Sequence, residues 1–267
     1  MDSRDVFEAH YHSADVLLRV YRLLESDPGP TQNHQMIAQF RTLIDSAPNE
    51  ELILLLNGLF VGIVRKRADV RLSFFRKDNL DLLLRQSVVA ACSALDVFVP
   101  HLLQAHLPEV VRIRQRNFLP NNGEVKGMFA DFRLKLEDIG PLAEEQDAEE
   151  RWNMIARRIL EHWGGKTLSN ETGISATLAL LGLEKPWAQI ASSAGESESA
   201  LRDKLKRVVS RRNDIVHRAD RARIDPNGAA QPIDFVWAQN HVGAVRTVAL
   251  ACHALARERM RELATTS

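Results

Sequence analysis

Apolar residues recur every three to four positions along most of the chain, and the strict alternation of apolar and polar residues that indicates strands is hard to find. Proline or glycine stands where the pattern is interrupted. We therefore expect an all-α fold. The pattern predicts helices at about residues 5–25, 33–45, 49–67, 79–106, 124–137, 147–163, 169–182, 197–219 and 233–263.

The most apolar segment is ELILLLNGLFVGIV, residues 51–64. It is too short to span a bilayer and is interrupted by Asn57, Gly58 and Gly62, so we expect a buried helix and no membrane partner. The start of the chain, MDSRDVFEAH, has no basic stretch followed by an apolar run. We therefore expect no signal peptide and a cytoplasmic location.

Composition supports a helical, folded chain. At 267 residues the chain can bury a sizeable core, and 13 glycines, 10 prolines and 2 tyrosines are few for a β-sandwich or barrel. Cys92 and Cys252 both lie in apolar helical patterns, which favours two buried thiols in a reducing compartment over a disulfide.

Charge is balanced overall, with 35 basic and 35 acidic residues, so any electrostatic argument must be local. Residues 137–150 contain seven acids and no lysine or arginine, which is most simply a solvated loop and helix start. Residues 202–223 contain nine basic residues and three acids.

The predicted helix in this basic segment carries an arginine where its apolar pattern calls for a hydrophobic residue. On a helical wheel Arg212 lies at the centre of the apolar stripe. Because an isolated buried charge is costly, its guanidinium must be paired, or must face a cleft or a subunit interface. The stripe consists of Leu201, Leu205, Val208, Val209, Ile215, Val216 and Ala219.

Asn213 and His217 lie one turn apart on the flank of this stripe. An arginine fork fits a phosphate and a histidine transfers protons near neutral pH, which together can support metal-free RNA cleavage by the neighbouring 2′-hydroxyl. The alternative is structural, with Arg212 in a buried ion pair and His217 capping or packing. Helix geometry alone leaves both interpretations open.

The sequence LKRVVSRRNDIVHRAD (205–220) resembles the signature helix of the HEPN superfamily, and most closely its RiboL-PSP-HEPN-like branch. That signature has an arginine, a polar residue that is commonly asparagine, a short spacer and a histidine. The resemblance covers about residues 79–260 and includes the segments 79–103, 180–191 and 232–255. One departure is Arg218, where many members have a small residue such as glycine.

The resemblance implies a HEPN-type up-and-down four-helix core with additional N-terminal helices. Residues 77–267 would form the HEPN domain, and residues 1–76 an N-terminal helical extension packed on it. Members are typically homodimers in which two signature helices form one composite active site. Many are metal-independent endoribonucleases that act as toxins or antiphage effectors under an antitoxin or regulatory partner, whereas others are inactive and bind RNA or protein.

By this resemblance Arg212 would stabilise the charge on the reacting phosphate, Asn213 would orient the phosphate or the 2′-hydroxyl, and His217 would act as general base or acid. No cofactor is implied. We also expect no metal site, because HYH (10–12) places its histidines on diverging faces and no other Cys or His pair completes a ligand set.

Supporting residues are predicted on the 79–106 helix. Asp96 is the candidate to orient Arg212 or His217, although an exposed or N-terminally paired aspartate fits the pattern equally well. Arg85 is a candidate phosphate contact, with a solvated arginine as the alternative. We expect the neighbouring Arg211, Arg218 and Arg221 to contact RNA.

Overall fold

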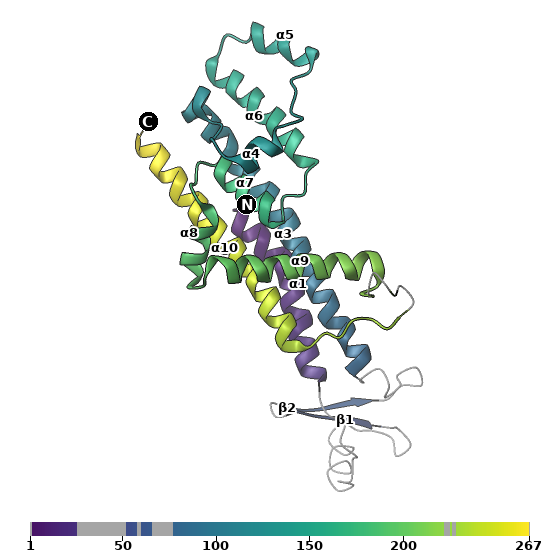
Figure 1. Ribbon diagram of the computed structural model, residues 1–267. Helices are drawn as coiled ribbons and strands as arrows, with labels where there is room; N and C mark the ends of the chain where they lie inside the picture. The colour runs from purple at the N-terminus through teal and green to yellow at the C-terminus, as the bar shows by residue number, and fades with distance from the viewer. Residues whose placement is uncertain are drawn as a thin grey trace.

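The structure is a computed structural model that describes residues 2–25, 52–57, 60–65, 77–221, 225 and 228–266. Within these residues the chain forms nine α-helices, one 3-10 helix and one hairpin (Figure 1). The helices are α1 Ser3–Leu24, α3 Lys77–Arg114, η2 Gln115–Asn117, α4 Gly123–Met128, α5 Leu136–Glu144, α6 Ala148–Gly164, α7 Glu171–Leu180, α8 Pro186–Ala194, α9 Glu198–Arg218 and α10 Phe235–Thr266. The hairpin is β1 Leu52–Asn57 and β2 Phe60–Arg65. The expected all-α class is confirmed outside this hairpin.

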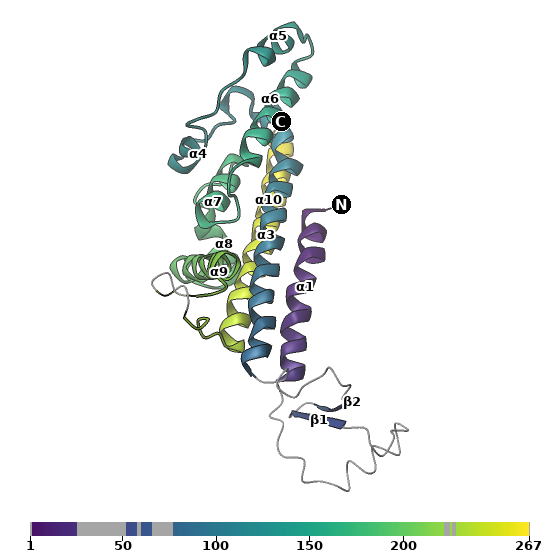
Figure 2. The same cartoon turned by 90° about the vertical axis from the view of Figure 1, so that its right-hand side faces the viewer.

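Three long helices form the centre of the molecule. α3 and α10 run in the same direction, and α1 lies beside them in the opposite direction (Figure 2). Phe7 of α1 packs edge-on against Phe98 of α3, with ring centroids 5.5 Å apart, and neither side chain is exposed. The Tyr11 hydroxyl donates to the main-chain carbonyl of Val242, which joins α1 to α10. By length and composition alone residues 79–114 could cross a membrane, but about half of their most apolar window is buried inside the molecule.

Helix α9 crosses the long helices rather than running alongside them (Figure 1). Its N-terminal half is anchored by Leu201, Leu205 and Val208, which are fully buried. The stripe predicted on the wheel does not stay buried to the end of the helix, because Val216 is 52% exposed. The C-terminal half of α9, which carries the Arg212 motif, therefore lies at the surface.

The predicted helix at 49–67 is wrong. Residues 52–57 pair antiparallel with residues 60–65, from Leu52 opposite Arg65 to Asn57 opposite Phe60. The run is rich in β-formers, and the glycine that follows Asn57 is a turn signal inside it. Short apolar runs do not distinguish a buried helix from a strand by period alone.

The helix predicted at 33–45 lies outside the described residues. The division of the chain into residues 1–76 and 77–267 stays a prediction.

The single helix predicted at 124–137 is also wrong. α4 ends at Met128, and the chain then turns so that Phe129 packs on Trp163 with centroids 5.5 Å apart. A new helix, α5, starts where the Asp138 carboxylate accepts the backbone N–H of Lys135 at 2.9 Å.

α8 was not predicted as a separate helix, although Pro186 at its first turn is a start signal. α3 continues to Arg114 through Pro108, because buried Leu107, Val110 and Val111 favour continuing the helix.

Candidate functional site

The Arg212 guanidinium is held by the carboxylate of Asp96. Nη2 of Arg212 donates to Oδ2 of Asp96 at 2.5 Å, joining α9 to α3 across 116 positions of sequence. The two side chains are 29% and 36% exposed, so the pair lies at the edge of the core rather than inside it. The structure thus brings together the two residues that the sequence suggested as partners.

Asp96 is itself oriented by a residue that the sequence did not suggest. Its other oxygen, Oδ1, accepts a hydrogen bond from the hydroxyl of Ser169, which is buried just before α7. α7 can lie against this segment because residue 173 is glycine: a Cβ there would fall 2.5 Å from Cα of Leu168. Ser169 stands in no recognisable motif, so only the fold reveals it.

The rest of the motif is exposed. Nη1 of Arg212 donates to Oδ1 of Asn213 at 3.0 Å, so the two neighbouring side chains lie together. His217 is exposed one turn further along α9, and its imidazole makes no hydrogen bond or ion pair within the described part of the chain. Within the described ranges, both ring nitrogens of His217 are thus without a partner.

An exposed face of α9 leads to this histidine. Lys206, Ser210, Asn213 and His217 are all exposed and are spaced four, three and four residues apart, which places them on one side of the helix. Among the described residues Lys206 has no ion-pair partner. The sequence analysis does not single out Lys206, because only the exposure of each residue on α9 shows which basic side chains share the face of His217.

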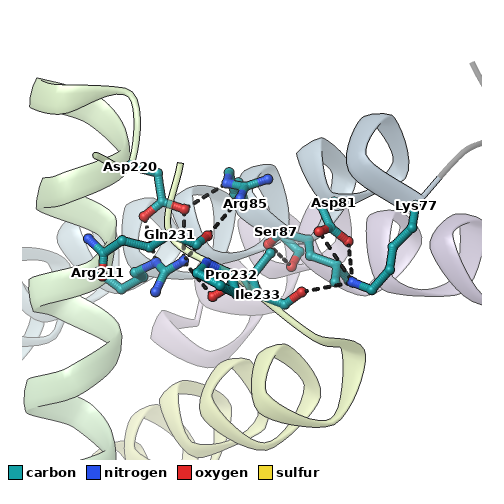
Figure 3. Close-up of polar contacts among 10 residues, drawn as sticks. Lys77, Asp81, Arg85, Ser87, Arg211, Asp220, Gln231, Pro232 and Ile233 are labelled. Atoms are coloured by element: carbon teal, nitrogen blue, oxygen red, sulfur yellow. Dashed lines mark hydrogen bonds and ion pairs between the residues drawn. The ribbon is translucent and has the colours of Figure 1, made fainter. Parts of the chain in front are cut away.

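Arg85 and Arg211 do not point toward this face but into a buried network around Asp220 (Figure 3). Nε of Arg85 donates to Oδ2 of Asp220 at 2.6 Å, and Nη2 of Arg211 donates to the same oxygen at 2.8 Å. Both arginines also donate to the main-chain carbonyl of Gln231, at 2.8 and 2.9 Å. These contacts differ from the RNA and phosphate contacts that the sequence suggested for the two arginines.

The backbone at the end of α9 positions Asp220 to accept from Arg85 and Arg211. Ala219 and Asp220 have φ of +49° and +63°, so the backbone reverses immediately after the helix. The N–H of Asp220 donates to the carbonyl of Asp214 at 2.9 Å, which closes the last turn. The network therefore fixes the helix end three residues beyond His217.

The two other predicted RNA contacts, Arg218 and Arg221, differ in whether their charge is paired. Arg218 pairs with Asp214 one turn earlier, which partly neutralises it. Arg221 is exposed and has no partner among the described residues. Of the three predicted RNA contacts, Arg221 alone has a side chain without a charged partner in the part of the chain that the structure describes.

Other chemistry near the motif is limited. Cys92 and Cys252 are free and buried, as predicted. Burial raises the pKa of the Cys92 thiol to about 12, against the opposing effect of Arg212, so the thiol is not a nucleophile at neutral pH. The described ranges hold no group of three His, Cys, Asp or Glu side chains arranged for a metal ion. His10 and His12 of the HYH sequence are exposed on α1.

Comparison of the chain with protein-family models, with curated proteins and with solved structures found no match.

Proposed function

We propose that this chain is a metal-independent endoribonuclease of the HEPN type. The observation that carries the proposal is that Arg212, fixed by Asp96, contacts Asn213, and that Asn213 and His217 are exposed one turn apart on the outer end of α9. A permanent cation beside a proton-transfer group is what phosphodiester cleavage by a neighbouring 2′-hydroxyl requires. The resemblance of residues 205–220 to the HEPN signature supports the same assignment.

In this mechanism His217 removes the proton from the 2′-hydroxyl, whose oxygen attacks the adjacent phosphorus. The bond to the 5′-oxygen of the next nucleotide breaks, and that oxygen receives a proton from a second His217. Arg212 stabilises the additional negative charge on the phosphorane, and Asn213 orients a phosphate oxygen. The products are a 2′,3′-cyclic phosphate and a 5′-hydroxyl.

The second histidine would come from a second copy of the chain. Val216 lies next to His217 and Val97 lies next to Asp96, and these valines are 52% and 41% exposed. Burying two such faces across a two-fold axis would bring two His217 side chains into one cleft. The four segments that carry the HEPN resemblance correspond to α3, α8, α9 and α10. The expected up-and-down arrangement of four helices is not what the structure has, because α3 and α10 run in the same direction, α9 crosses them and α1 lies beside them.

Lys206 and Arg221 are the proposed RNA contacts on either side of the catalytic residues. Both are exposed and unpaired among the described residues, and each neutralised phosphate strengthens binding in a salt-dependent way. Arg85 and Arg211 serve instead to hold the end of α9. In a cell we expect this activity to act as a toxin or antiphage effector in the cytoplasm, restrained by an antitoxin or another regulatory partner.

A second candidate function is an inactive HEPN domain that binds RNA or protein. It is favoured by one observation: the Arg212 fork already contacts Asp96 and Asn213, so a phosphate must share the guanidinium with them. In that case substitutions of Arg212 and His217 would change binding or stability, and neither the wild type nor the variants would cleave RNA.

RNA cleavage by the wild-type chain and by His217→Ala separates the two functions. We expect the wild type to cut single-stranded RNA in excess EDTA, with 2′,3′-cyclic phosphate ends identified by mass spectrometry, and His217→Ala to lose at least about a hundredfold in rate. His12→Ala, which removes an exposed histidine far from the motif, serves as the matched control. Cleavage that stops in EDTA and returns only with a divalent ion would contradict the proposed mechanism.

A further inference from the structure

Helix α5 presents two of its apolar residues to solvent and one of its three acids to the protein. Leu136 and Ile139, one turn apart, are 86% and 51% exposed. Asp138, between them, is only 4% exposed. A helix on the surface of a globular protein normally has the opposite arrangement, with its apolar stripe against the core.

The orientation of α5 is fixed by the buried acid. The Asp138 carboxylate accepts the N–H of Lys135 and forms an ion pair with Arg158 of α6. Rotating α5 to bury Leu136 and Ile139 would break this ion pair and expose the carboxylate. The apolar side chains therefore remain outside while these contacts persist.

This surface lies at one end of the molecule. α5 is the outermost element there, beyond α6 and at the end opposite to the hairpin (Figures 1 and 2). Leu134, just before the helix, is a further exposed apolar side chain. The apolar surface formed by Leu134, Leu136 and Ile139 is called the α5 surface below.

The α5 surface is bordered by negative charge. Residues 137–150 contain seven acids and no basic residue, whereas Arg133 and Lys135, the latter paired with Glu137, stand beside Leu134 and Leu136. Some of these acids are paired, as Glu150 is with Arg157. Glu144, Asp147 and Glu149 are exposed and form no ion pair among the described residues. An occupant of the α5 surface therefore meets an apolar centre and a mainly acidic rim, on which Arg133 is an exposed cation.

We propose that the α5 surface docks a basic amphipathic helix of a partner protein. Leucine-like residues on one face of that helix would cover Leu136 and Ile139, and its lysines or arginines would meet Glu144, Asp147 and Glu149. A second copy of this chain fits poorly, because two acidic rims would be brought together. RNA and an anionic membrane are disfavoured by the same charge. The inference does not depend on the proposed ribonuclease activity.

The test uses a fluorescently labelled Leu/Lys peptide of about 18 residues, or about five helical turns, designed to place all leucines on one face. Binding to the full chain is measured by fluorescence anisotropy. A scrambled peptide of equal composition lacks the apolar face and should bind at least about tenfold more weakly. Equal binding of both peptides would overturn the proposal, because charge alone would then explain it.

Variants locate the site. We expect Leu136→Ser/Ile139→Ser to weaken binding about tenfold, and Glu144→Gln/Glu149→Gln to weaken it severalfold and to reduce its salt dependence. Leu82→Ser alters a leucine at the start of α3 that is 56% exposed, close to the 51% of Ile139, and should bind the peptide like the wild type. Circular dichroism verifies that each variant is folded. Folded serine variants that bind the peptide as tightly as the wild type would overturn the proposal.

Two further measurements identify other occupants. Sedimentation of the wild type and of Leu136→Ser/Ile139→Ser should give the same oligomeric state. The chain should not float with vesicles of neutral lipid. It should also not float with vesicles of about 30% anionic lipid, whose surface charge is about that of a cytoplasmic leaflet. Dissociation of an oligomer by the serine variants would assign the surface to a second copy, and vesicle binding that the serine variants abolish would assign it to a membrane. Either result would overturn the proposal.

Discussion

Arg85 of α3 donates a hydrogen bond of 2.6 Å to Asp220, a residue that lies 135 positions later in the chain and has no exposed surface. Lys77, on the same helix as Arg85, also contacts the segment after Asp220, through the carbonyl of Ile233 at 3.3 Å (Figure 3). The end of α9 is therefore tied to the start of α3 at several points.

The first prediction concerns the charge of Asp220. Asparagine has nearly the shape of aspartate and tolerates a left-handed backbone. Asp220→Asn therefore changes mainly the charge, and it leaves Arg85 and Arg211 without their carboxylate partner. We expect the free energy of unfolding to fall by about 3 kcal/mol or more, measured by urea denaturation. Asp203→Asn, an exposed position earlier in α9, should change it by less than about 0.5 kcal/mol. Equal effects of the two substitutions would show that the network contributes no special stability.

The second prediction concerns Arg212. Because its ion pair with Asp96 is about one-third exposed, Arg212→Ala should cost no more than about 1 kcal/mol of stability. Arg212→Lys keeps the charge but loses the bidentate fork, so RNA cleavage should fall by orders of magnitude in both variants. Melting temperature and cleavage rate are measured on the same preparations. A large loss of stability with cleavage retained per folded molecule would make Arg212 structural and refute the proposed function.

The third prediction concerns assembly. If two copies share a cleft, the wild type should sediment as a dimer at micromolar concentration, and Val216→Glu should give a monomer without cleavage activity. Val236→Glu alters another exposed valine, at the start of α10, and should leave both properties unchanged. An active monomer would rule out the composite site while leaving a single-copy ribonuclease possible.

The fourth prediction concerns pH. Burial lowers the pKa of His253, whose Nδ1 lies 3.4 Å from a carboxylate oxygen of Asp2 and which also faces Arg257. Burial also lowers the pKa of His106, with His253 as a further cause. The unfolded chain therefore binds more protons than the folded one below about pH 6.5, so stability is full above that pH and decreases below it.

The measurement is the urea midpoint between pH 7.5 and 5.5. We expect His253→Gln to have a flatter pH profile than the wild type, because glutamine has no proton to bind. His12→Gln, which alters an exposed histidine on α1, should keep the wild-type profile. A wild-type midpoint that rises as the pH decreases would contradict the sign of the predicted effect.

The long helices could be predicted because their period persists for many turns. α1, α9 and α10 begin and end within about three residues of the predicted bounds. The pairing of Arg212 with Asp96 could be anticipated because a guanidinium on an apolar stripe requires a partner. The role of Arg85 could not, because its partner Asp220 lies in a left-handed turn whose direction is set by tertiary contacts. Local patterns also gave no indication that Asp138 would turn inward and leave Leu136 outside.

The pairing of α1 with α10 has a consequence for the order of events during synthesis. Glu8 contacts Arg246, and these residues are 238 positions apart. At about 5–20 residues per second a ribosome needs roughly 10–50 s to progress from one to the other. From the time α3 emerges until α10 is made, the apolar side chains of α3 that face α10 in the finished protein have no native cover. The emerging chain is thus most exposed to aggregation and to chaperones late in translation, just before α10 leaves the exit tunnel.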